Sequence, residues 1–308
     1  MPGLRITGGS LDYQCQGDPQ RPPLLLLHAL GSSLAMWDAQ ATVFAAHFHV
    51  IRYSLRGHGA STGTGAPEMD LGAIAGDACA LLDALDVGRA HWCGLSLGGM
   101  VAMQVASHAP ERVARLVLAS TTAHFPPPAS WSERIALVRT QGLAPLAEAT
   151  MARWFTASFR QREAGEVARI RRQFLATDPA GYAAACAAVR DMDLRARLPA
   201  IQAPTCLIAG AADAALPPER MAALAAEQGL LCQPIHWPHP NGLSWIVLAR
   251  PEDRDRVPPM SDSLPALQRE LDLARRRLAE IQGHPLVALG LRVNQALRKG
   301  LRRVRGAS

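Results

Sequence analysis

The chain has 308 residues, of which 49% are hydrophobic and 19% charged. This composition excludes a disordered, collagen-like or small disulfide-stapled protein, and the length suffices for one large or two small globular domains. The formal net charge is +6, but twelve Lys and Arg face seven Asp and Glu from Pro251 onward, so the preceding part is nearly neutral. A surface for nucleic acid or anionic lipid would therefore lie in the tail, where we expect a solvated charged helix instead.

Membrane-spanning stretches, secretion signals and metal-binding cysteine patterns are all missing from the sequence. No hydrophobic run approaches the roughly 20 residues of a membrane helix, and the first residues lack the basic and apolar regions of a signal peptide. The six cysteines stand singly, without metal-ligand spacing. We therefore expect reduced thiols, no metal site, no membrane association and a cytoplasmic protein.

Short apolar runs alternate with helical patterns along most of the chain, which predicts an α/β protein with a mostly parallel, doubly wound sheet. After an N-terminal hairpin around Ile6–Cys15, the expected strands are Pro23–Leu27, Phe48–Tyr53, Ala90–Cys93, Val113–Ala119, Thr205–Ala209 and Cys232–Trp237. The expected helices between them are Leu71–Leu85, Leu97–His108 and Pro218–Gln228.

Two segments depart from this alternation. Residues 125–199 read as helix throughout, which predicts a helical cap inserted into a core made of residues 1–124 and 200–250. We expect no strand after Pro238. Residues 251–308 begin as a polar linker and continue as a basic amphipathic helix, whose apolar positions are Leu264, Leu267, Leu271, Leu278 and Ile281.

The strongest chemical signal is the segment Gly94-Leu95-Ser96-Leu97-Gly98, which joins an expected strand to an expected helix. A G-x-S-x-G turn in this context holds the serine in a strained conformation, and the glycines on either side make room for it. The hydroxyl of Ser96 would then project above the sheet edge as a nucleophile. A glycine-rich turn with an incidental serine is the alternative, but it leaves the flanking strand and helix unexplained.

A serine nucleophile needs a general base that is itself oriented by a carboxylate. In this topology the acid and then the histidine follow the serine, on loops after later strands. Asp213 follows the expected strand Thr205–Ala209, although a turn aspartate or a helix cap would occupy the same place. For the base we prefer His239 over His236, because a base needs a loop position beyond the strand end; a surface histidine is the alternative for each.

An oxyanion at the attacked carbonyl needs backbone N–H donors. The amide of Leu97, the first of the helix after the serine turn, is one candidate. The amide of Leu30, in the turn after Pro23–Leu27, is the other. The segment Arg56-Gly57-His58-Gly59 follows the next strand, and we expect His58 to be structural rather than catalytic.

With these residues the chain resembles the α/β-hydrolase superfamily and, within it, the 3-oxoadipate enol-lactonases of aromatic catabolism. The similarity runs from about Ile6 to His239. The segments GLSLGG and RGHG are shared with esterases and cofactor-free haloperoxidases and indicate only the superfamily. The cap segments RWFTASF and AACAAVRDMDLR are more restrictive and indicate the lactonases.

The resemblance implies that Ser96 attacks the lactone carbonyl and forms an acyl-enzyme. His239, held by Asp213, would take the serine proton and later activate water, while the two amides hold the oxyanion. No metal or other cofactor is implied, and the partner is a small lactone that carries a carboxylate. Polar or cationic cap residues should bind that carboxylate, with a place in the cap core or in solvent as the alternative for each; the candidates are Trp131, Arg134, Trp154 and Arg190.

The resemblance ends after His239. The lactonases continue with an apolar, helix-forming stretch that completes the domain, whereas this chain reads PNGLSWIVLARPEDRDRVPP and then enters the basic tail. A shifted reading frame and a natural fusion both explain this change. Two alternatives to a lactonase follow: a general carboxylesterase or perhydrolase with the same triad, or an impaired hydrolase scaffold that acts as an interaction protein.

Overall fold

The structure, a computed structural model, describes residues 3–63, 69–210, 212–227, 231–235 and 243–249. All of these residues belong to the first of two units of the chain, Met1–Asp253. The second unit, Arg254–Ser308, contains most of the predicted basic tail and lies outside the described residues. None of the helices within the described ranges is long and apolar enough to cross a membrane.

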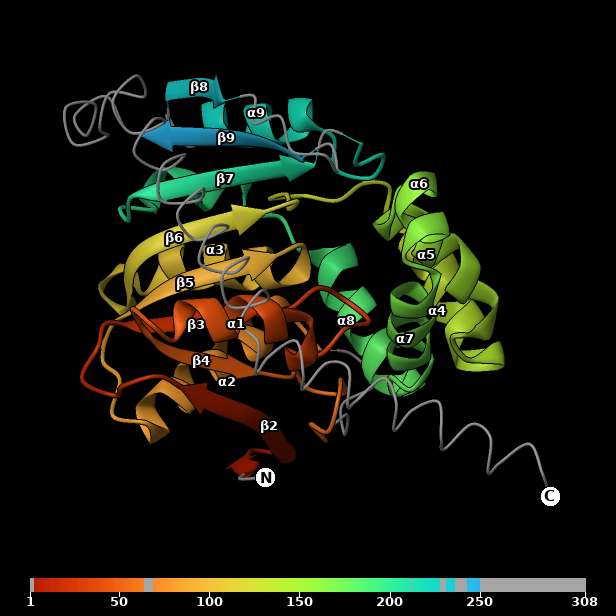
Figure 1. Cartoon of the computed structure of the whole chain (residues 1–308), viewed down its shortest axis with the longest axis horizontal. Coiled ribbons are helices and arrows are strands. Elements are labelled where there is room, and N and C mark those ends of the chain that lie inside the picture. Colours follow the sequence, from red (N-terminus) through yellow and green to blue (C-terminus); the bar gives the residue numbers. More distant parts are fainter. Residues whose placement is uncertain (1–2, 64–68, 211, 228–230, 236–242, 250–308) are drawn as a thin grey trace, which may run out of the picture. The chain divides into compact units, whose positions relative to one another are not determined.

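The described strands form one sheet in the order β1-β2-β4-β3-β5-β6-β7-β9-β8 (Figure 1). From β4 to β7 all neighbours are parallel, whereas β1, β2 and β9 pair antiparallel. This arrangement confirms the predicted α/β fold with a mostly parallel sheet. The strands are Gly3–Ile6 (β1), Gly9–Gln16 (β2), Pro23–Leu27 (β3), His49–Tyr53 (β4), Ala90–Leu95 (β5), Val113–Ala119 (β6), Thr205–Gly210 (β7), Leu231–Ile235 (β8) and Leu243–Ala249 (β9).

Strand β3 shows how the sheet is covered on both faces. Leu24 and Leu26 pack in one hydrophobic cluster with Trp37, which precedes α1 (Asp38–Phe44). Leu25 and Leu27 belong to a larger cluster with α2 (Leu71–Ala84) and α3 (Leu97–His108). Because side chains alternate along a strand, this run of leucines buries both faces, as expected for a central parallel strand.

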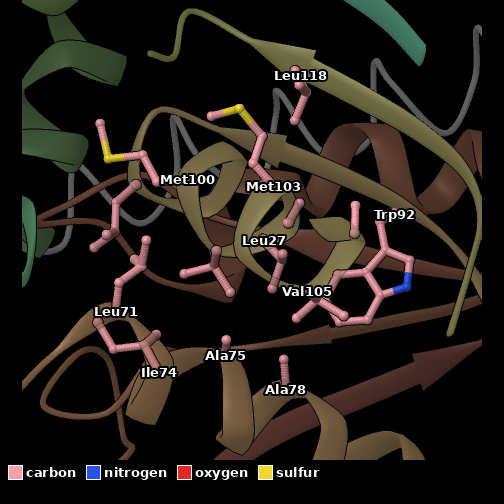
Figure 2. Close-up of a cluster of buried hydrophobic side chains, with 14 of the residues drawn as sticks. Leu27, Leu71, Ile74, Ala75, Ala78, Trp92, Met100, Met103, Val105 and Leu118 are labelled. Atoms are coloured by element: carbon pink, nitrogen blue, oxygen red, sulfur yellow. The ribbon is translucent and has the colours of Figure 1, made fainter. Parts of the chain in front are cut away.

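The larger cluster is the core of the molecule. Figure 2 shows side chains of α2 and α3 meeting Leu27, Trp92 and Leu118 of the sheet. Trp92 is fully buried, and its indole N–H donates to the carbonyl of Arg112 at 3.1 Å, so its polar atom is satisfied. Helix α9 (Pro218–Glu227) adds Met221 and further residues to the same cluster.

Between β6 and β7 the described chain is helical: α4 (Pro128–Gln141), α5 (Ala147–Trp154), α6 (Ala157–Arg162), α7 (Ala164–Leu175) and α8 (Pro179–Asp191). Figure 1 shows α4 to α7 grouped beyond the carboxyl ends of β6 and β7. These helices, called the cap from here on, bury a hydrophobic cluster of their own, which includes Phe174 and Tyr182. The division of the chain into core, cap and tail domains stays a prediction.

The chain enters and leaves this helical region at one place. An isolated β-bridge joins His124 to Asp193, and the N–H of Leu194 donates to the carbonyl of Ala123 at 2.8 Å. The two crossings between the helices and the sheet are therefore tied together by backbone hydrogen bonds.

The prediction that no strand follows Pro238 is wrong. Leu243–Ala249 forms β9, which pairs antiparallel with β7 and with β8. Its sequence LSWIVLA is rich in Trp, Ile and Val, which favour strands, and such a short apolar run buries its backbone polar groups by pairing. Strand β8 consequently lies at the edge of the sheet rather than beside β7.

Candidate active site

Ser96 lies in the turn between β5 and α3, and its backbone is strained. Its φ of 53° and ψ of −115° are rare for a residue with a side chain. A Cβ on Gly94 would lie 2.3 Å from the carbonyl carbon of Gly98, and a Cβ on Gly98 would lie 2.3 Å from the carbonyl oxygen of Leu27. Space therefore requires both glycines, and the geometry fits the nucleophile elbow that the sequence predicts.

The backbone of Ser96 is held from two sides. Its N–H donates to the carbonyl of Ala119, the last residue of β6, at 2.9 Å. Its carbonyl accepts the N–H of Met100 at 3.0 Å, within α3. The Ser96 side chain does not cap α3, so its hydroxyl is not engaged by the first turn of that helix.

The two predicted oxyanion amides come from neighbouring strand ends. Leu27 of β3 pairs with Gly94 of β5, so the turns after these strands meet at the same edge of the sheet. Leu30 lies in the first turn. Leu97 opens α3 in the second, where helical N–H groups have no partner within the helix. Both amides thus lie at the edge that carries Ser96, and their role towards an oxyanion stays a prediction.

His28 fixes the turn that carries Leu30. Its Nε2 accepts the N–H of Leu55 at 2.8 Å, so its Nδ1 carries the proton and donates to the carbonyl of Ala29 at 2.8 Å. Burial, and to a lesser extent the charge of His58, lowers the pKa of His28 to about 3. The ring is therefore neutral and acts as a bridge between two loops, a role that the sequence analysis did not assign.

Asp213 follows β7, at the same edge of the sheet. Its N–H donates to the carbonyl of Gly210 at 3.1 Å, and its Oδ1 accepts the N–H groups of Ala215 and Leu216 at 3.0 and 2.9 Å. The carboxylate thus closes its own turn, as the alternative interpretation expected. Both amides bind Oδ1, and no described residue donates a hydrogen bond to Oδ2. Oδ2 is therefore open to a histidine N–H.

The two candidate bases, His236 and His239, lie outside the described residues. The residues on either side of them are described. Ile235 ends β8, which runs parallel to β7, and Leu243 begins β9 opposite Gly210. Both therefore lie at the edge of the sheet that carries Asp213 and Ser96. The choice between the two histidines stays a prediction.

The turn at His58 follows β4, and the rings of His58 and His28 have centroids 5.4 Å apart. Arg56 binds Asp77 through two hydrogen bonds of 2.9 and 2.6 Å and donates to the carbonyl of Thr7 at 2.8 Å. His58 is completely buried, and burial lowers its pKa to about 4 despite the hydrogen bond to the carbonyl of Arg56. A neutral, buried imidazole agrees with the structural role that the sequence analysis expected.

Three of the four predicted substrate-binding residues belong to one group of contacts in the cap. Arg134 lies over the ring of Trp131 at 5.4 Å and donates to the hydroxyl of Tyr182 at 3.0 Å. Tyr182 packs edge-on against Phe174, which packs edge-on against Trp154, with ring centroids 5.8 and 5.9 Å apart. Trp131 and Trp154 are thus partly cap core, as the alternative expected.

This group reaches the turn after β3. A Cβ on Gly31 would lie 2.8 Å from Phe174 and 3.0 Å from Tyr182, so only a glycine fits beneath the two rings. Tyr182 therefore connects the guanidinium of Arg134 to the turn that carries Leu30.

Arg190, the fourth candidate, lies apart from this group. It binds the carboxylate of Asp191 through two hydrogen bonds of 2.7 Å. Eight residues separate it from Tyr182 on α8, which places the two about 12 Å apart along the helix axis.

Arg153 is a residue that the sequence analysis missed. Partial burial and the repulsion from Arg134 lower its pKa, while Tyr182 and Asp213 raise it. The charges of Tyr182 and Asp213 therefore act on the side chain of Arg153, which comes from α5. Arg153 precedes Trp154 in the segment RWFTASF, and this position could have identified it as a candidate substrate-binding residue. The sequence analysis selected only Trp154 from this segment. We call Arg134, Arg153 and Tyr182 the cationic cluster.

Metal ligands and reactive thiols do not gather at this edge. Among the described residues, no three His, Cys, Asp or Glu side chains are placed to hold a metal ion. Burial raises the pKa of the Cys93 and Cys186 thiols to about 12, so neither is a thiolate at neutral pH. The serine turn is the group in the described part of the chain best suited to nucleophilic chemistry.

Known proteins share this architecture. A family profile described as alpha/beta hydrolase fold matches residues 22–243. The chain is 37% identical over 205 residues to 3-oxoadipate enol-lactonase 2 of Acinetobacter baylyi. The matched stretch covers 66% of this chain and 76% of that protein. It is 35% identical to the putative carbamate hydrolase RutD of Variovorax paradoxus, over 68% of this chain and 80% of that protein.

Among solved structures, the enol-lactonase from Burkholderia xenovorans LB400 is 36% identical to this chain and superposes with a TM-score of 0.70. The match covers 73% of this chain and 87% of that structure. The resemblance to enol-lactonases is therefore confirmed. A strained serine turn between a parallel strand and a helix, in a chain matched over most of its length, makes this protein a member of the alpha/beta hydrolase fold family.

Proposed function

We propose that this α/β hydrolase opens the lactone ester of 3-oxoadipate enol-lactone to 3-oxoadipate, a step of aromatic catabolism by the β-ketoadipate pathway. The observation that carries the proposal is the strained turn at Ser96, beside the turn that carries Leu30. The names of two relatives, both enol-lactonases, support the choice of substrate. The proposal includes the cytoplasmic location that the sequence predicts.

The proposed reaction has two acyl-transfer steps. Oγ of Ser96 attacks the lactone carbonyl carbon while His239, oriented by Asp213, takes the hydroxyl proton. The N–H groups of Leu30 and Leu97 stabilise the oxyanion. The ring C–O bond then breaks, the enol receives the proton and becomes the ketone. His239 next takes a proton from water, the resulting hydroxide attacks the acyl carbon, and Ser96 leaves with the proton restored.

The cationic cluster supports an anionic substrate. The charge of Arg134 acts on Arg153, and Tyr182 connects Arg134 to the turn that carries Leu30. Two positive charges near a reacting ester favour a substrate that carries a carboxylate, because a guanidinium binds a carboxylate through charge-assisted hydrogen bonds. The enol-lactone has such a carboxylate, whereas a simple ester does not.

Turnover of two substrates by the full-length chain tests the proposal. We expect kcat/KM for 3-oxoadipate enol-lactone to exceed that for p-nitrophenyl acetate by roughly a hundredfold or more, because only the lactone engages the arginines. Ser96→Ala should lower both activities by at least about a thousandfold and abolish labelling by a fluorophosphonate probe.

The other outcomes contradict parts of the proposal. Preference for the neutral ester, with Ser96 labelled, would show a general carboxylesterase or perhydrolase. Absence of both turnover and labelling in the folded wild-type chain would show a scaffold without hydrolytic activity. Full activity in the Ser96→Ala variant would remove the serine from the mechanism altogether.

A further inference from the structure

Thr121 lies two residues after the end of β6 and contacts the serine turn between β5 and α3. Its side chain is completely buried, and its hydroxyl donates to the carbonyl oxygen of Ser96 at 2.7 Å. The backbone N–H of Thr121 points to the sulfur of Met221 on α9, at 3.5 Å. Thr121 therefore lies where the serine turn, the end of β6 and the helix after the Asp213 loop meet.

The end of β6 is shaped to make this contact. Ser120 has a φ of 38°, in the left-handed region, and its N–H donates to the carbonyl of Ile208 on β7 at 2.8 Å. The residues on either side of Ser120 both bind Ser96. Ala119 accepts the Ser96 N–H through its carbonyl, and Thr121 donates its hydroxyl to the Ser96 carbonyl.

The fit around Thr121 is tight. A Cβ on Gly99, in the first turn of α3, would lie 2.8 Å from Cβ, Cγ2 and Oγ1 of Thr121. The threonine side chain therefore fills the space beside the helix, and the missing side chain at Gly99 lets it approach. A carbon in place of Oγ1 would stand too close to the Ser96 carbonyl oxygen for a van der Waals contact, so a hydrogen bond is required at this distance.

We propose that Thr121 is a positioning residue for the nucleophile. A residue with a φ of 53° keeps that conformation only when its surroundings impose it, and the Thr121 hydroxyl anchors one of the two peptide groups that border Ser96. Loss of this anchor lets the turn relax and moves Oγ of Ser96 away from its attacking position. The inference rests on the proposed function, since it requires Ser96 as the nucleophile.

Three variants of the full-length chain test this role. Thr121→Val replaces the hydroxyl by a methyl group, Thr121→Ser keeps the hydroxyl, and Thr205→Val is the matched control. Thr205 is also buried, and its hydroxyl donates to the carbonyl of Ala203 at 2.9 Å, at the amino end of β7 and away from the site. The measurements are kcat, KM, the rate of fluorophosphonate labelling and the melting temperature.

We expect Thr121→Val to lower kcat and the labelling rate about tenfold or more with KM changed less than about twofold, because the attacking atom is displaced. Thr121→Ser should restore both rates to within about twofold of wild type. Thr205→Val should lower the melting temperature without changing kcat or labelling. If the valine variant does not fold, Thr121→Ala removes the same hydroxyl without crowding the carbonyl and should give the same kinetic loss.

Two results would overturn the inference. In the first, Thr121→Val, or Thr121→Ala in its place, labels and turns over as fast as Thr205→Val. In the second, Thr121→Ser is as slow as the valine variant, which would assign the effect to packing. Either result, with Ser96→Ala inactive, leaves the proposed function standing. Activity in Ser96→Ala would instead remove the proposed function and this inference together.

Discussion

Arg134 is the single residue that best tests the class of substrate. Replacing it by glutamine removes the positive charge and the hydrogen bond to Tyr182. For the enol-lactone we expect KM to rise about tenfold or more, because a charge-assisted hydrogen bond to the carboxylate is lost. For the neutral p-nitrophenyl acetate both kinetic constants should stay close to wild type. Steady-state kinetics on the two substrates measure the difference.

Arg139 supplies the control for this comparison. It lies on the same helix, is exposed and has the same charge, but it comes five residues after Arg134 and therefore lies about 140° further round the helix axis. Arg139→Gln should therefore leave KM for the lactone unchanged. An equal rise in KM in both variants would show that the overall charge of the cap, and not Arg134 itself, causes the effect. No rise in KM in either variant would show that Arg134 does not bind the substrate.

Local motifs predicted the positions of Ser96 and Asp213 because each follows a recognisable strand within a few residues. The sequence analysis missed Arg153 and Tyr182 for the opposite reason. They come from α5 and α8, and only the packing of the cap brings their side chains together. A helix face that binds ligand has the same spacing in sequence as a helix face that packs against a neighbour.

At the scale of elements, the two loops after β3 and β4 should make the fold sensitive to acid. Burial lowers the pKa of His28 to about 3 and that of His58 to about 4, from an ordinary value of 6.5. The unfolded chain therefore binds more protons below pH 6.5, and stability falls as pH falls through that value. Between pH 7 and pH 5 we expect each histidine to remove about 2 kcal/mol from the free energy of unfolding.

Urea denaturation at several pH values measures this loss. His58→Asn removes one of the two titrating groups, so the dependence between pH 7 and pH 5 should become shallower in the variant. A free energy of unfolding that stays constant over this range in the wild-type chain would contradict the buried, neutral state of both rings.

The elements themselves were predictable to different degrees. The central strands and α3 were recognised because parallel strands buried on both faces are continuously apolar and the helix follows a glycine turn. Helix α1 was missed because seven residues are too few to show helical periodicity. Strand β9 was missed because its pairing partners, β7 and β8, are not defined by its own sequence.

At the scale of the whole molecule, the core shared by α2, α3 and the sheet should dominate stability. Leu81 of α2 is completely buried in this cluster, away from the serine turn, whereas Val43 of α1 is 65% exposed. Leu81→Ala should lower the free energy of unfolding by about 2–5 kcal/mol, because it leaves a cavity. Val43→Ala should change it by no more than about 0.5 kcal/mol.

Chemical denaturation measures both variants, and enzyme assays of the folded protein accompany it. The kcat of Leu81→Ala should match wild type, since its side chain does not contact the candidate site. A loss no larger than that of Val43→Ala would mean that this cluster does not limit the stability of the fold.

The sequence by itself determined the family of this protein, the alternation of strands and helices, and the place of Ser96 in a glycine turn. These features are local, because a strand, a glycine turn and a helix follow one another within residues 90–108. Only the tertiary structure decided that β9 separates β8 from β7, that His28 joins two loops and that Thr121 binds the carbonyl of Ser96. These contacts join segments far apart in the chain, and packing, rather than local residue preference, selects them.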